Sequence, residues 1–171
     1  IAMTFAMGYL VLTYLIAVAV GSFMGYLGGK SDMLGLRFVE IWANVPFLYM
    51  VIILVSVMPV GWGIGWQVSS LLIIMVLFSW TGMTYYIRAS VYKEKARDYI
   101  SAAKVIGASP FRIVFKHLLP NVVSTLVTFA PFTIAAAISS ITALDFLGYG
   151  LPPPTPSWGE LLKQGVNNLR T

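Results

Sequence analysis

The sequence predicts an all-α membrane protein whose 171 residues cross the bilayer several times. Hydrophobic residues make up 58% of the chain and charged residues only 10%, whereas soluble domains contain about 25% charged residues. Long stretches carry no charge at all, and an excess of positive charge is concentrated in one segment between two of them. The chain contains no cysteine, which excludes disulfides and thiolate metal sites within it.

Four spanning helices are predicted from the charge-free runs, which cover residues 1–29, 41–87 and 118–144. A span needs about 20 apolar residues, so the first and last runs hold one span each. The middle run is too long for one span. It is interrupted at 59–67 by a proline and several glycines, together with two tryptophans that suit a membrane interface. The expected spans are 3–28, 41–58, 68–87 and 118–144. A soluble helical core is the alternative, and it is disfavoured because nothing amphipathic remains to face water.

Both ends of the chain suggest that it continues beyond them. Ile1 already lies inside an apolar run without a basic region before it, which argues against a signal peptide. Thr171 follows a short polar helix. We therefore expect flanking segments on both sides.

Orientation follows from the lysines and arginines. Between Arg88 and His117 lie seven of them against two acidic residues, an excess equal to the net charge of +5 of the whole chain. Positively charged loops stay in the cytoplasm. The 88–117 segment is thus predicted to be cytoplasmic, and 59–67 and 145–171 external. By alternation, 30–40 is a cytoplasmic loop, although its own charges cancel.

The predicted spans are informative about packing. Gly21, Gly25 and Gly29 are four residues apart, a spacing that lets two helices approach closely. Pro46 and Pro131 lie inside spans, where each can kink the helix as a gate or, as we prefer, a simple bend. No ionisable side chain lies within any predicted span, which is unusual for ion-driven carriers. This composition favours a passive gate that another protein moves.

The 98–119 segment predicts two short helices joined by a sharp turn. Tyr99, Ala102, Ala103 and Ile106 have helical spacing and form one apolar stripe, which Asp98 can cap at its start. Gly107 suits the left-handed position after the helix. Ser109 and Pro110 then have the preferences of an N-cap and a first helical residue. The second helix runs from Pro110 to about Leu119, meets Pro120 and leads into the next span. A small apolar face ringed by cations is typical of a helix that fits a groove on another protein.

These residues also carry a resemblance to a known family. The pattern that resembles the EAA loop of ABC importer permeases is Asp98-Tyr99-x-x-Ala102-Ala103-x-x-x-Gly107-Ala108-Ser109-x-x-x-Ile113-x-x-x-His117-x-Leu119-Pro120-Asn121. The resemblance implies a coupling helix that docks on an ATPase subunit. The residues it assigns to coupling are Asp98, Tyr99, Ala102, Ala103, Ile106, Gly107, Ala108, Ser109, His117 and Pro120. Ser101 departs from the general consensus, which has Glu there, as members of the peptide-importer branch often do.

A second stretch, 145–160, resembles the external loop after the fifth span in the dipeptide, oligopeptide and nickel branch of that family. Its marker residues are Gly148, Gly150, Pro153, Pro156, Trp158 and Gly159. The 144–146 and 164–169 stretches are similar to permeases of the oligopeptide and microcin C type. Within the loop, Ser157 and Glu160 also form a capping box that predicts a new helix.

The resemblance implies the fold and the function together. It implies a MetI-like type I permease bundle, with spans two to five of a six-span subunit forming a single domain over 1–171. It further implies a bacterial inner-membrane protein that imports peptides or peptide-like solutes, and no enzyme activity in this chain. ATP and Mg would be used by a partner ATPase and no cofactor bound here. The implied partners are cytoplasmic ATP-binding subunits, a second permease chain of different sequence, an external solute-binding protein and the lipid bilayer.

Alternative readings of individual motifs are weaker. Gly28-Gly29-Lys30-Ser31 mimics the end of a phosphate-binding loop, but Met24 stands where its first glycine belongs. The basic helix–turn–helix could not enter a DNA groove from between two spans, so no nucleic acid is expected. His117 is the only histidine, so a multi-histidine metal site is excluded. The rival functions are an ATP-independent carrier or channel and a membrane-embedded enzyme or scaffold.

Overall fold

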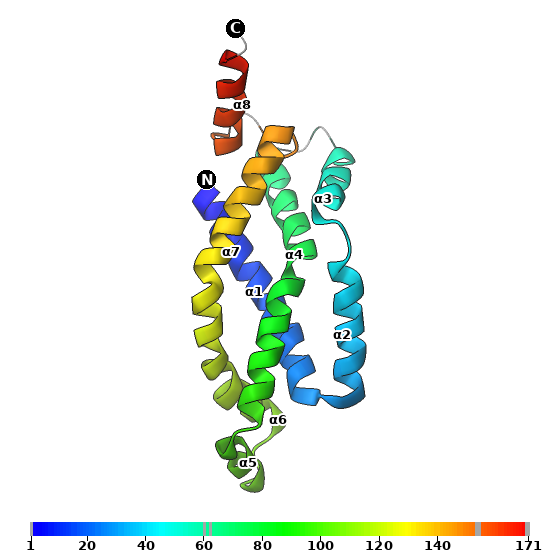
Figure 1. Ribbon diagram of the computed structural model, residues 1–171, viewed down its shortest axis with the longest axis vertical. Coiled ribbons are helices and arrows are strands. Elements are labelled where there is room, and N and C mark those ends of the chain that lie inside the picture. The colour runs from blue at the N-terminus through cyan, green and yellow to red at the C-terminus, as the bar shows by residue number, and fades with distance from the viewer. Residues whose placement is uncertain (1, 60, 62, 153–154, 170–171) are drawn as a thin grey trace. The chain divides into compact units, whose positions relative to one another are not determined.

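The computed structural model describes residues 2–59, 61, 63–152 and 155–169, and these residues form helices without any strand (Figure 1). The helices are α1 (Ala2–Leu27), α2 (Gly29–Ala43), α3 (Phe47–Ser56), α4 (Ile64–Lys95), α5 (Asp98–Val105), α6 (Pro110–Arg112), the π-helical turn η1 (Ile113–Leu118), α7 (Leu119–Leu147) and α8 (Trp158–Asn168). The predicted all-α class is confirmed.

The chain forms two compact units. Unit 1 contains 1–12, 45–78 and 131–171, and unit 2 contains 13–44 and 79–130. Helices α1, α4 and α7 each contribute residues to both units. Within the described part of the chain, the helical stretches long and apolar enough to span a membrane are α1, α4 and the continuous helix Pro110–Leu147. Helices α2 and α3 make a fourth if the two together form one bent span.

The predicted loop at 30–40 and the predicted span at 41–58 were wrong in their boundaries. Residues 29–43 form α2, and α3 follows after a break at which the two helix axes bend by 67°. Pro46 occupies the N-cap position of α3 with ψ 103°, and it disfavours a helical conformation in the residue before it. Asn44 ends α2 by donating from both its backbone and its side chain to the Glu40 carbonyl oxygen. Pro46 therefore separates two helices and does not kink one.

The helices are also longer than the charge-free runs that predicted them. Helix α4 continues through Arg88 to Lys95, because lysine and glutamate are good helix formers and cations suit a helix C-terminus. Helix α7 continues past position 144 to include Asp145. The charge-free predicted spans are therefore shorter than the helices α4 and α7 that contain them, and the added charges lie near the helix ends. The break at 59–67 is confirmed in part, because α4 begins at Ile64, before Trp66; Trp62 lies outside the described residues.

The second predicted helix leads directly into the span, as one continuous helix Pro110–Leu147 that includes Pro120. Pro120 lies in the first turn of α7, directly after η1, where the Leu119 N–H donates to the Val114 carbonyl five residues back. Proline has no N–H for the usual bond to the fourth residue before it. A π turn before Pro120 changes the hydrogen-bond register there, so the helix continues through the proline. Pro131 lies inside α7 as predicted.

Close packing of α1 on α4 organises unit 2. A Cβ atom added to Gly21 would lie 2.9 Å from the Ile87 Cβ, and one added to Gly25 would lie 2.9 Å from the Val91 Cβ. The close helix approach that the glycine spacing predicts is therefore confirmed at Gly21 and Gly25. Gly29 does not extend it, because α1 ends at Leu27, Gly29 has φ 58° and open space surrounds it. On another side of unit 2, Met24, Val39 and Trp80 form a buried cluster that joins α1, α2 and α4.

We expect Gly21→Ala to destabilise the protein by about 1–3 kcal/mol, the usual effect of overpacking. The added methyl group would also lie 2.9 Å from the Thr84 backbone oxygen, which cannot rotate away. Thermal unfolding of the full-length protein in lipid nanodiscs measures the effect. Gly82→Ala is the matched control, because nothing lies within 4 Å of its Cβ position. Equal melting temperatures for the two variants would contradict close α1–α4 packing.

Candidate functional site

The predicted coupling segment forms a short helix, α5, whose start differs from prediction. Asp98 is the first helical residue and Arg97, in an extended conformation, occupies the N-cap position without a side-chain cap. The prediction that Asp98 caps the helix is therefore wrong. Its carboxylate instead contributes negative charge to the first turn, where the helix dipole favours it. The Arg97 guanidinium donates to Glu94 in the last turn of α4 at 3.0 Å.

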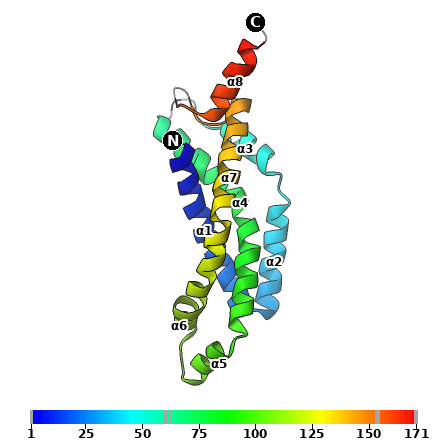
Figure 2. The same ribbon diagram turned by 60° about the vertical axis from the view of Figure 1, so that its left-hand side comes forward.

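The end of α5 has the geometry that the sequence predicts. Gly107 adopts φ 84°, its N–H donates to the Lys104 carbonyl at 3.0 Å, and the Ala108 N–H donates to the Ala103 carbonyl at 3.0 Å. This pair of bonds is the Schellman motif, which requires a left-handed residue at the position of Gly107. Ser109 then caps α6 by accepting from the Arg112 N–H, and Pro110 is the first residue of that helix. The turn between α5 and α6 is visible in Figure 2.

Tyr99 connects α5 to both neighbouring helices. Its hydroxyl donates to Glu94 of α4 at 2.8 Å and accepts from the Asn121 side-chain amide of α7 at 3.1 Å. The same amide donates to the His117 carbonyl, and the Tyr99 and His117 rings lie 6.4 Å apart. Burial raises the pKa of the Tyr99 phenol, and the Glu94 carboxylate adds to the shift. The phenol is therefore protonated at neutral pH and can donate to Glu94. Sequence patterns did not single out Glu94 or the bridging role of Asn121.

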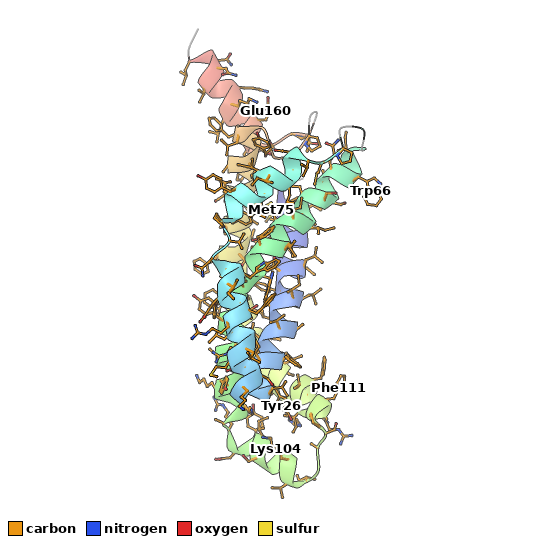
Figure 3. The ribbon with its side chains drawn as sticks, turned by 90° about the vertical axis from the view of Figure 1, so that its right-hand side faces the viewer. Tyr26, Trp66, Met75, Lys104, Phe111 and Glu160 are labelled. Atoms are coloured by element: carbon orange, nitrogen blue, oxygen red, sulfur yellow. The ribbon has the colours of Figure 1, made fainter. Side chains whose placement is uncertain are left out.

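Apolar side chains are exposed around the turn. Val105 and Ile106 are 89% and 85% exposed, and Phe111 of α6 is 70% exposed. Lys104 and Phe111 lie at the same end of unit 2 as Tyr26 (Figure 3). Ile100, which was outside the predicted stripe, is fully buried and anchors α5 to the protein. Of the predicted stripe, Ala102 and Tyr99 are exposed and Ala103 is half-buried. A short helix is thus held by one side while its C-terminal end presents apolar surface.

A buried ion pair that the sequence did not reveal lies in the same unit. The Arg88 guanidinium of α4 donates two hydrogen bonds to the Asp32 carboxylate of α2, each 2.5 Å long. Asp32 is 5% exposed, and the Tyr92 hydroxyl also donates to it at 3.3 Å. One turn further on, the Lys95 ammonium donates to the Tyr26 carbonyl at the end of α1. The last turns of α4 therefore contact three helices. Arg88 pairs with α2, Lys95 binds the end of α1, and Glu94 binds Tyr99 of α5.

The second predicted site, the 145–160 loop, lies in unit 1 and is built by close backbone packing. Gly148 has φ 85° and ends α7 with a second Schellman motif, in which the Tyr149 N–H donates to the Leu144 carbonyl at 2.9 Å. A Cβ atom on Gly150 would lie 1.7 Å from an Asp145 carboxylate oxygen. One on Gly159 would lie 2.3 Å from the Asp145 Cβ. The loop therefore closes around Asp145, and only glycine fits at these two positions.

A capping box at the start of α8 would consist of a bond from the Glu160 N–H to the Ser157 side chain and one from the Ser157 N–H to the Glu160 side chain. The first of these bonds forms. Ser157 Oγ accepts from the Glu160 N–H at 3.1 Å, whereas the Glu160 carboxylate accepts from the Gln164 side chain. Pro156 and Trp158 are exposed, and Pro153 lies outside the described residues. Among the described residues, the structure thus groups the loop residues with one another in unit 1 and the coupling residues with one another in unit 2.

Comparison with known proteins shows which family the chain belongs to. A family model described as "Binding-protein-dependent transport system inner membrane component" matches residues 17–166. The chain is 39% identical over 170 residues to the peptidoglycan transport system permease protein YejE of Agrobacterium fabrum, which covers 99% of this chain and 43% of that protein. It is 44% identical over 154 residues to the inner membrane ABC transporter permease protein YejE of Escherichia coli, covering 90% of this chain and 43% of that protein.

A third relative comes from Lactococcus lactis. Its dipeptide transport system permease protein DppC is 35% identical over 170 residues, which is 99% of this chain and 48% of that protein. The chain thus spans about half the length of the curated relatives it matches, and these relatives are permease proteins. The extent of the family match, together with the apolar helices, shows that the chain belongs to the family of binding-protein-dependent transport system inner membrane components and has the MetI-like fold of type I permeases.

Proposed function

We propose that this chain is the core of a permease subunit in an ATP-driven importer, where it forms part of the pathway for peptides or peptide-like solutes. Two permease subunits line that pathway, and an external binding protein delivers the solute to the side that carries 145–160. Cytoplasmic ATPase subunits bind α5 and move it when they close on ATP. Support for a peptide-like solute comes from the relatives, which are named as permeases for peptidoglycan or dipeptide transport.

The observation that carries this proposal is the exposed apolar end of α5. Val105 and Ile106 are almost fully exposed at the end of a helix whose other side is anchored by Ile100 and bridged by Tyr99. Apolar side chains on a rigid helix are suited to fill a groove on a partner protein. Since Tyr99 bonds to both α4 and α7, a displacement of α5 would be transmitted to two membrane helices. The proposed coupling residues from Asp98 to Pro120 would thus contact the ATPase or transmit the displacement of α5 to the membrane helices.

A cross-linking experiment tests the proposal. A single cysteine at Ala103, in a cysteine-free version of the full-length protein, would carry a photo-crosslinker in native membranes with and without ATP. We expect the captured partner to be an ATPase subunit, with a yield that changes when ATP is added. A crosslinker at Gly165 of α8, which is exposed and open to added side chains, is the control and should not capture the ATPase.

The opposite outcome would favour another class of transporter. If the crosslinker at Ala103 captured only lipid, whether or not ATP was present, the cations of 88–117 would be a topology signal alone. An ATP-independent carrier or channel would then be the better reading. Solute uptake by vesicles that lack any ATPase would identify it.

A further inference from the structure

A cavity of about 630 Å³ lies beside the 145–160 loop in unit 1, lined by the start of α1, the end of α7, the loop itself and the start of α8. Its lining includes Asp145, Ser157, Trp158, Glu160 and Gln164. Cavities of about 300–1,000 Å³ are the usual size of small-molecule sites. Figure 3 shows Glu160 on α8. The cavity therefore has the size of a binding site and brings two carboxylates together with an aromatic ring.

Asp145 is buried without a full set of partners. It is 7% exposed, and one of its carboxylate oxygens accepts from the Leu151 N–H at 2.5 Å. The other oxygen, Oδ2, is buried and makes no hydrogen bond of ordinary geometry among the described residues, although the Ser157 hydroxyl lies beside the carboxylate. A buried carboxyl group in this state either keeps its proton or needs a positive charge nearby. Gly150 and Gly159 hold the backbone tightly around this side chain, so the structure keeps it in place.

The described lining of this cavity is acidic. Among the described lining residues there is no lysine, arginine or histidine, and the second carboxylate, Glu160, adds to the negative charge. The N–H groups of Glu160 and Leu161 at the start of α8 are already bonded to the Ser157 hydroxyl and carbonyl oxygens. They are therefore not available to Asp145. The described lining leaves the negative potential of the cavity without a neutralising side chain.

The chemistry of the lining distinguishes between kinds of cation. The described residues contain no group of three or more His, Cys, Asp or Glu side chains that could hold a metal ion, and the lining offers an aromatic ring instead. Trp158 lines the cavity and is 59% exposed, and a tryptophan face attracts organic cations. A carboxylate at the rim, a second one beneath it and an indole together suit an ammonium or guanidinium group. We propose that this cavity binds the ammonium or guanidinium group of a small organic solute. In this arrangement Glu160 and Trp158 contact the cation and Asp145 attracts it from below.

Ligand binding to the full-length permease, assembled with its partner subunits in lipid nanodiscs, tests this site. The probe is tri-alanine methyl ester, which carries one ammonium group and no carboxylate, and saturation-transfer NMR gives its Kd. Its N-acetyl derivative has the same side chains without the charge. We expect the charged probe to bind about tenfold more tightly than the acetylated one, and Asp145→Asn to weaken its binding about tenfold. The asparagine retains an oxygen that can accept from the Leu151 N–H, so the loop should remain folded.

Two further variants make the result decisive. Glu160 is exposed on α8, so its substitution should leave the fold intact. We expect Glu160→Gln to weaken binding of the charged probe as well. Glu40→Gln removes the same charge from an exposed residue that does not line the cavity, and should leave the Kd unchanged. Equal binding of the two probes, or full binding by both Asp145→Asn and Glu160→Gln, would overturn the proposal. The assay contains no ATP, so its failure would leave the proposed coupling to an ATPase untouched.

Discussion

Asp32→Asn is expected to lower the free energy of unfolding by about 3 kcal/mol, the lower part of the range for breaking a buried ion pair. The substitution removes the charge that two Arg88 hydrogen bonds of 2.5 Å and the Tyr92 hydroxyl surround. Arg88 would then remain as a cation with its partner lost and with a side chain only 24% exposed. The lower end of the range applies because this partial exposure gives the guanidinium some access to solvent.

Thermal unfolding of the full-length protein in nanodiscs measures this effect, which should appear as a fall in Tm of at least about 5 °C. The exposed pair Arg37–Glu40, with a length of 2.8 Å, is the matched control. Because exposed ion pairs contribute about 0–1 kcal/mol, Glu40→Gln should change the Tm little. In the double variant Asp32→Asn/Arg88→Gln, the loss should be smaller than the sum of the two single losses, since the residues share one interaction. Additive losses would show that the pair does not form.

Gly107→Val is expected to reduce solute uptake by more than about tenfold while the protein remains in the membrane. Gly107 has φ 84°, a conformation that a β-branched residue adopts only at a cost of about 1–3 kcal/mol. Relief of that strain would break the bonds from Gly107 to Lys104 and from Ala108 to Ala103. The end of α5, with Val105 and Ile106, would then no longer be held in one orientation.

Gly107→Asn is the control at the same position, because asparagine tolerates the left-handed conformation much better than valine. We expect it to retain most of the uptake. ATP hydrolysis and uptake should be measured together in proteoliposomes that contain the complete transporter. Valine should reduce the number of solutes moved per ATP hydrolysed. If valine and asparagine had the same effect, the backbone conformation at this position would not matter for coupling.

Features that depend on neighbouring residues could be predicted from the sequence. The left-handed glycine at 107, the Ser109 cap with Pro110 after it, and the Ser157 cap were all predicted and found. Each depends on hydrogen bonds that reach only three to five residues along the chain. The all-α class could be predicted because the composition of the bilayer-facing stretches restricts the backbone to helices. The similarity of 98–121 and 145–160 to a known family predicted the membership that the comparisons show.

Helix boundaries were predicted less well, since they depend on competition between charge and helix propensity. The charges at 30–40 suggested a loop, but this stretch is helical because Asp32 is paired with Arg88 and Val39 is buried against Met24 and Trp80. The two prolines at 46 and 120 also show that a proline by itself does not fix a helix boundary. The first separates two helices, and the second lies in a helix that a preceding π turn allows to continue.

By itself, the sequence determined the class of protein, the short helices around position 107 and the loop signals after position 147, because each is written in adjacent residues. Only the tertiary structure decided that Arg88 pairs with Asp32, 56 residues away, and that Tyr99 connects α4 to α7. It also decided that Gly159 packs on Asp145. Such contacts depend on which helix faces meet, and helix packing is set by the shapes of many side chains together. No local pattern of charges or glycines contains that information.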